Sequence, residues 1–189
     1  MKKLMIVLAV LGVAFFMMSC GSKEPAAPAN AMQNELDGAP DWVLNESAGG
    51  SGLICGVGSA TGTRNVSLAR TAAQGRGRTA IARSLETKVK AMLKDYQSTT
   101  TGGEAFGQAA NDEQHIEDVS KQITDTTLSG TEQKNTWISK TGTLYVQMCM
   151  DLEKFKGAVN QMQQLDEKIR AAVVERANKA FSELDEATK

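Results

Sequence analysis

The sequence predicts an α+β fold in which a three-stranded antiparallel sheet is packed by one long helix and followed by a long C-terminal helix. Three features carry this prediction: an apolar stretch with glycines at 53–60, an apolar repeat over 65–96, and two strand-like stretches at 134–139 and 143–150, of which the second alternates. Apolar residues three and four apart indicate a helix, whereas strict alternation indicates a strand. The low aromatic content of 5% favours such a small domain over a large β-sandwich.

The first twenty residues have the composition of a secretory signal. Two lysines precede an apolar run from Leu4 to Met18, and Ser19 and Cys20 follow it. The run is shorter than the roughly 20 residues that a membrane-spanning helix needs, so residues 1–19 are interpreted as a signal peptide. The residues around Cys20 resemble the bacterial lipobox, which predicts lipidation of Cys20. The alternative is an ordinary signal peptide followed by an incidental cysteine.

The residues after Cys20 predict a flexible tether over 20–38. Residues 21–28 are small, polar and rich in proline and alanine, so they cannot bury enough apolar surface to fold. Stable anchoring takes two signals, such as two acyl chains, and bacterial lipoproteins carry two or three, palmitate among them. Because Gly21 stands where an aspartate would retain the protein at the inner membrane, we expect the outer membrane.

The charge balance argues against polyanionic partners. Removing Lys2 and Lys3 from the 21 basic residues leaves 19, against 22 acidic residues, and the sequence contains no basic block. Nucleic acid and anionic lipid are therefore not expected as partners.

The first half of the domain is predicted to contain a single strand, at 53–60. Residues 40–43 form a first apolar anchor, and a Gly/Ser-rich turn over 48–52 leads into the strand at 53–60. Gly56 and Gly58 within this strand indicate that another element packs closely against it.

A long helix over 65–96 is predicted to cross this sheet. It would span about 48 Å, whereas an eight-residue strand spans only about 27 Å. The helix must therefore overhang the sheet, and its C-terminal half needs a second packing partner. Gly75 and Gly77, which each cost about 1 kcal/mol relative to alanine, are expected where the helix crosses the sheet.

The second half is predicted to contain a loop over 98–110, a helix over 112–128 and a hairpin with its turn at 140–142. In the second hairpin strand the residues expected to face the core are Leu144, Val146, Met148 and Met150, whereas Tyr145, Gln147 and Cys149 face the other way.

A last helix is predicted to run from an N-cap at Asp151 to about residue 187. Its apolar stripe over 165–187 permits two interpretations, a coiled-coil arm or a helix packed on the globular core.

Two cysteines remain after Cys20, and both are predicted to lie on strands. Cys55 and Cys149 could form a disulfide, which an exported protein permits. The alternative is two free, buried thiols that act as small apolar side chains.

No pattern of catalytic or metal-binding residues emerges. Gly56 and Gly58 lack the third glycine of a dinucleotide-binding motif, and His115, the single histidine, lies in an acidic helix start without a nucleophile motif. Trp42 and Trp137 are expected in the core rather than in a ligand pocket. We therefore expect neither an enzyme, nor a metal site, nor a cofactor.

The order of several short motifs resembles the Lpp-twenty family of small bacterial outer-membrane lipoproteins. These motifs are Pro40-Asp41-Trp42, Gly56-Val57-Gly58-Ser59-Ala60, Ser67-Leu68-Ala69-Arg70, Leu128-Ser129-Gly130, Thr136-Trp137-Ile138, Gly142-Thr143-Leu144-Tyr145-Val146 and Met150-Asp151. The resemblance implies a dodecin-like strand–helix–strand–strand domain over about 39–155 and no catalytic residues. The C-terminal helix over 156–189 lies mostly outside it.

The sequence therefore predicts a lipid-anchored outer-membrane protein with a non-enzymatic structural or partner-binding role, facing the periplasm or the cell exterior. A protein partner or self-association is expected, with the C-terminal helix as the contact surface. The alternative is a small-ligand-binding module formed by a dodecin-like oligomer.

Overall fold

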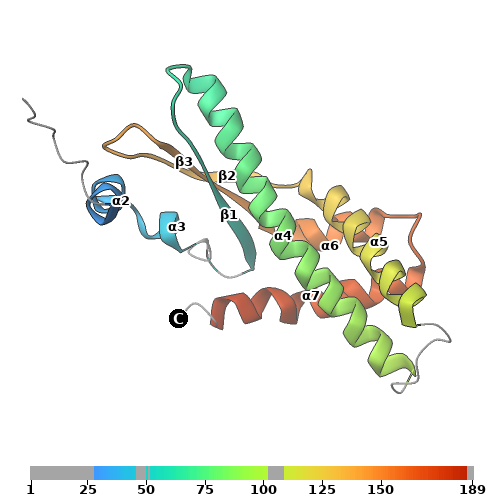
Figure 1. Cartoon of the computed structure of the whole chain (residues 1–189). Coiled ribbons are helices and arrows are strands. Elements are labelled where there is room, and N and C mark those ends of the chain that lie inside the picture. The colour runs from blue at the N-terminus through green and yellow to red at the C-terminus, as the bar shows by residue number, and fades with distance from the viewer. Residues whose placement is uncertain (1–27, 46–49, 51, 102–108, 187–189) are drawn as a thin grey trace, which may run out of the picture. The chain divides into compact units, whose positions relative to one another are not determined.

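The structure is a computed structural model that describes residues 28–45, 50, 52–101 and 109–186 (Figure 1). The chain divides into two compact units, Met1–Gln33 and Asn34–Lys189, and the sheet belongs to the second. The predicted signal peptide and Cys20 lie outside the described residues. The first part of the tether predicted over 20–38, residues 20–27, also lies outside the described residues, and the prediction is corrected at Pro28–Leu36, which forms helix α2. Its proline stands at the first helical position, where the missing N–H costs nothing.

The sheet has three antiparallel strands in the order β1-β3-β2, which confirms the predicted fold class. They are β1 (Leu53–Ala60), β2 (Glu132–Ile138) and β3 (Leu144–Asp151). Strands β1 and β2 thus both pair with the central strand β3, and β2 and β3 form the predicted hairpin. Each strand lies within two residues of its predicted bounds.

One face of the sheet is covered by the long helix α4 (Val66–Thr101) (Figure 1). The glycines of β1 allow this contact. A Cβ atom on Gly56 would lie 2.6 Å from the carbonyl oxygen of Gly77, and one on Gly58 would overlap the backbone of Ala73 and Gly77. Close packing, rather than nucleotide binding, therefore explains the two strand glycines.

The two helix glycines differ in role. A Cβ on Gly77 would lie 2.8 Å from Met148 Cγ, so this glycine sits at the predicted crossing point. Gly75 was expected there too, and this was wrong: it is exposed and has open space beside it. A helix turns about 100° per residue, so two residues along the chain are enough to point away from the sheet.

The overhanging half of α4 is covered by α5 (Ala109–Leu128) and α7 (Glu167–Glu186), as the length argument predicted. The predicted loop over 98–110 is too long, because α4 continues to Thr101 and α5 begins at Ala109. The core beneath these helices consists of almost fully buried apolar side chains, including Leu85, Val89, Ile123, Phe155, Val159, Val173 and Phe181.

The prediction of a single C-terminal helix was wrong, since the structure has two helices there, α6 (Leu152–Gln161) and α7. Asp151 caps α6 as predicted, accepting from the Glu153 and Lys154 amides. Asp166 Oδ1 accepts from the Lys168 amide at the start of α7. The chain turns between the two helices, so that α7 folds back onto α6. Phe181 then packs against Phe155, with ring centroids 5.4 Å apart. The apolar stripe of α7 thus packs on the core, at least to Phe181.

The second face of the sheet is also partly covered. Short helix α3 (Asp41–Leu44) brings Val43 into a buried position, and Gln147 and Cys149 on this face of β3 are buried as well. Gln147 accepts a hydrogen bond from Asn135 Nδ2 at 2.8 Å, but its own Nε2 has no acceptor among the described residues.

A disulfide joins β1 to β3 on this second face. Cys55 and Cys149 are directly opposite in the strand register, and their sulfurs are bonded at 2.05 Å. The bond closes a loop with a sequence separation of 94 residues. Cross-linking so distant a pair removes conformational freedom from the unfolded chain.

We predict that replacing both cysteines by alanine lowers the free energy of unfolding by about 2–5 kcal/mol. Urea denaturation of the protein in detergent measures the change. Reductant should cause the same loss in the wild type and none in the double variant. A wild-type protein whose stability ignores reductant would contradict the prediction.

Candidate functional site

The strongest polar cluster lies where the N-terminal segment meets the β2–β3 hairpin. Glu35 Oε1 accepts a hydrogen bond of 2.9 Å from the Tyr145 hydroxyl, and Glu35 Oε2 accepts one from Thr141. Asp37 forms an ion pair with Lys140. We call these five residues the hairpin clamp. The clamp fastens Glu35 and Asp37 to the hairpin turn and to the central strand β3.

The hairpin turn holds its side of the clamp in place. The Gly142 amide donates to the Ser139 carbonyl at 3.0 Å, and the Ser139 hydroxyl accepts from the Thr143 amide at 3.0 Å. Gly142 has φ of 91°, a conformation that favours glycine. Lys140 and Thr141 at the tip are thereby presented to the two acidic side chains.

The clamp shifts the titration of its two central groups. The hydrogen bond from Thr141 lowers the pKa of Glu35 below its usual value of 4.5, with smaller contributions from neighbouring hydroxyls. Burial, followed by the hydrogen bond to Glu35, raises the pKa of Tyr145 above 10.0. Both shifts favour the same state, a neutral phenol that donates to an ionised carboxylate.

Trp137 supports the clamp from the neighbouring strand. Its ring lies against that of Tyr145, with centroids 5.3 Å apart, and it is half-buried. Trp42 is also half-buried, on α3. No aromatic contact joins the two tryptophans within the described part of the chain, so Trp137 acts here as a packing residue.

A hollow of about 280 Å³ lies between α4 and α7. Its charged groups connect the two helices. Arg176 Nε donates to Asp95 Oδ2 at 2.7 Å, its guanidinium lies 5.5 Å from the Tyr96 ring centroid, and Lys88 Nζ donates to the Ala180 carbonyl at 2.7 Å. This arrangement stabilises the α4–α7 contact and brings together no pair of nucleophile and general base.

The remaining candidates stay apart. His115 is exposed on α5. Across the described ranges, no group of three or more His, Cys, Asp or Glu side chains is arranged to hold a metal ion. Likewise, no helix within those ranges has both the length and the apolar character needed to cross a bilayer.

The family model of the LPP20 lipoproteins matches residues 40–151, which is more than half of the chain. The chain belongs to the LPP20 lipoprotein family. No curated protein matches it. The match runs from the residue before α3 to the end of β3, and it therefore includes the sheet, α4 and α5. In this LPP20 protein, α6 and α7 follow the matched region.

The hairpin clamp crosses the boundary of the family match. Lys140, Thr141 and Tyr145 lie inside it, whereas Glu35 and Asp37 precede it. Sequence reasoning missed the clamp, because its two acidic residues fall in the segment predicted as a flexible tether. No sequence pattern connects them to partners more than a hundred residues away.

We predict that the contribution of Glu35 to stability depends on pH. Because its pKa is lowered in the folded state, the unfolded chain binds the extra proton first, and stability is lost as pH falls through the folded pKa. At pH 7 the wild type should exceed Glu35→Gln in unfolding free energy by at most about 1 kcal/mol. Below pH 4.5 that difference should shrink.

Urea denaturation of both proteins at pH 7 and pH 3.5 tests this dependence. Taking the difference between wild type and variant cancels the other carboxylates, including Glu132, whose pKa is lowered by Lys154. A difference that stays constant or grows in acid would refute the role assigned to Glu35.

Proposed function

We propose that this LPP20 lipoprotein is anchored in the outer membrane through lipidated Cys20 and has a non-enzymatic structural or partner-binding role in the cell envelope. The observation that carries the proposal is the family match combined with a cysteine placed directly after a signal-like apolar run. The clamp adds support, since it connects the segment after Cys20 mechanically to the sheet. A domain held in this way would transmit force or position from the membrane to its partners.

The length of the connecting chain limits how far the domain can move from the bilayer. Fourteen residue steps separate Cys20 from Asn34, where the second unit begins. Even a fully extended chain of that length spans at most about 50 Å. Partners are therefore expected close to the membrane surface.

The surface offered to a protein partner differs from the sequence expectation. The apolar stripe of α7 packs against α4 and α6, with Ala172, Val173, Ala177 and Phe181 buried and Ile169, Val174 and Ala180 partly buried, so it is not available for a coiled coil. A partner that contacts α7 would meet its polar outer side. The proposal keeps partner binding or self-association, through a surface other than the apolar stripe of α7.

A ligand-binding role is the second candidate. The hollow between α4 and α7 and the buried Gln147 amide are the features in its favour. The charged groups of the hollow already connect the two helices, which places this role second. A small molecule that copurifies in native mass spectrometry would reverse the order.

We predict that cells fed labelled palmitate incorporate it into the wild type and not into Cys20→Ala. The wild type should fractionate with outer membranes, because its acyl chains would hold it there. A Cys55→Ala, Cys149→Ala double variant is the matched control and should retain the label. Label on Cys20→Ala, or wild type found with inner membranes, would contradict the proposal.

Cross-linking in the same cells tests the partner-binding part. One recurrent envelope protein cross-linked to the domain would support it. Self-cross-links alone would identify a homo-oligomer and would strengthen the ligand-binding alternative.

A further inference from the structure

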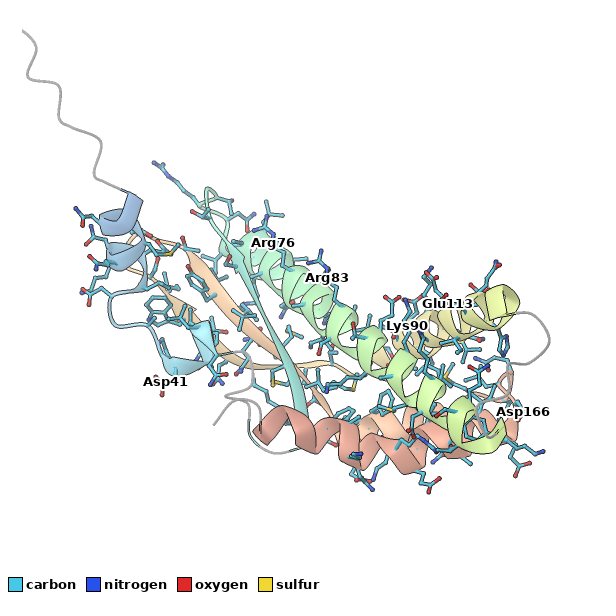
Figure 2. All side chains as sticks on the ribbon, turned by 60° about the horizontal axis from the view of Figure 1, so that its bottom comes forward. Asp41, Arg76, Arg83, Lys90, Glu113 and Asp166 are labelled. Atoms are coloured by element: carbon cyan, nitrogen blue, oxygen red, sulfur yellow. A yellow bond between two sulfur atoms is a disulfide. The ribbon has the colours of Figure 1, made fainter. Side chains whose placement is uncertain are left out.

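An unusual run of arginines occupies the beginning of α4 and the loop before it. Residues 61–85 contain five arginines and no lysine, aspartate or glutamate. They are Arg64, Arg70, Arg76, Arg78 and Arg83, and all five are exposed. Figure 2 shows Arg76 and Arg83 projecting from α4. We call these five residues the arginine surface.

No member of the arginine surface forms an ion pair with a described carboxylate, whereas eight other basic residues do. Arg76 donates to the Ser59 carbonyl, and Arg78 Nε donates to Thr131 Oγ1 at 3.1 Å. Further along α4, Lys90 pairs with Glu86 at 2.8 Å. Arginines without neighbouring acids keep their whole charge for an external anion.

Two large apolar side chains are exposed among these arginines. Val66 is 62% and Leu68 58% exposed, in the first turn of α4. Asn65 caps this turn by accepting from the Leu68 amide at 3.1 Å. Exposed aliphatic side chains surrounded by arginines are typical of surfaces that lie at a bilayer interface.

The first residues of the arginine surface, Arg64 and Arg70, lie at the same end of the sheet as the clamp. Its later members follow α4 to the point where Ile81 packs against Gly56 in the middle of β1. The strand register pairs Ala60, the last residue of β1, with Leu144, and Leu144 with Ile138. The hairpin turn that holds Glu35 follows Ile138, and α4 starts shortly after Ala60. Glu35 and Asp37, in the segment that follows the proposed anchor in sequence, therefore lie at the end of the sheet where α4 and its exposed apolar residues begin. Ile138 at this end is itself 61% exposed.

We propose that the arginine surface docks onto the anionic phospholipid headgroups of the membrane that holds the lipid anchor. The inference rests on the proposed anchoring through Cys20. Guanidinium groups bind phosphate oxygens in a bidentate manner, and Val66 and Leu68 would enter the headgroup region. The acyl anchor and this surface together hold the domain in one orientation. Because these arginines are separated in the sequence and form no contiguous basic block, an anionic lipid contact was not expected from the charge balance.

A fluorescent label on Leu68→Cys tests the contact in the full lipidated protein. With Cys20 acylated and Cys55 bonded to Cys149, the new thiol is the reactive one. The label is read on vesicles of phosphatidylcholine alone and on vesicles with added phosphatidylglycerol. The matched label site is Gln163→Cys, which is exposed in the turn between α6 and α7.

The expected result is a blue shift at position 68 on anionic vesicles, none on neutral vesicles, and none at position 163. Each arginine near an anionic surface contributes roughly a five-fold preference. Replacing Arg64, Arg70 and Arg83 by glutamine should therefore reduce the docked-to-free ratio on the order of a hundred-fold. These three arginines make no described side-chain contact, so the fold should be retained. Lys94, Lys121 and Lys168 changed to glutamine lower the net charge equally and should leave docking intact.

Failure of this inference can be distinguished from failure of the anchor. Protein that floats with neutral vesicles but shows no shift at position 68 on anionic ones would overturn the arginine surface alone. Protein that does not float with neutral vesicles would overturn the anchor, and the shift on anionic vesicles would still decide the arginine surface. A shift caused by a DNA oligonucleotide at physiological salt, and not by vesicles, would overturn membrane docking in favour of nucleic acid.

Discussion

The close approach of α4 to β1 is the contact on which the rest of the structure depends. At Gly56 and Gly58 the backbone of the helix occupies the space in which a side chain would stand. This approach fixes where α4 crosses the sheet and how much of its length remains beyond it. The remaining half must bury its apolar stripe elsewhere, and α5, α6 and α7 form the second part of the core for that reason.

The two faces of the sheet have different roles. The side with Met148 and Met150 faces α4 and supplies stability. The other side carries the disulfide and, at the hairpin end, the clamp. Because β3 is central, a force applied through the clamp is carried to β1 by the ladder and by the bond between Cys55 and Cys149. This arrangement suits a domain whose N-terminal segment is proposed to lead to a membrane anchor.

The strands β1 and β3 and the helices α4 and α5 could be predicted from the spacing of their apolar residues, and β2 from the turn that joins it to β3, whereas α2 lies in a segment that composition predicted as a tether. The break between α6 and α7 could not be predicted, since Gln163 and Gln164 are neither glycine nor proline and the Phe155–Phe181 contact across the break joins residues distant in sequence. The clamp was equally hidden, because it joins Glu35 and Asp37 to a distant hairpin. The arginine surface could not be recognised from charge counts, because its arginines are spread over residues 64–83 and form no contiguous basic block.

The most direct test of the central packing contact compares two glycine variants of the same protein. Gly58→Ala places a Cβ against backbone atoms that cannot move aside, so it should lower the unfolding free energy by about 3 kcal/mol or more. Gly75→Ala, in open space on α4, should raise it by up to about 1 kcal/mol through helix propensity. Urea denaturation of both in detergent measures the difference. A Gly58→Ala protein as stable as the wild type would contradict the account.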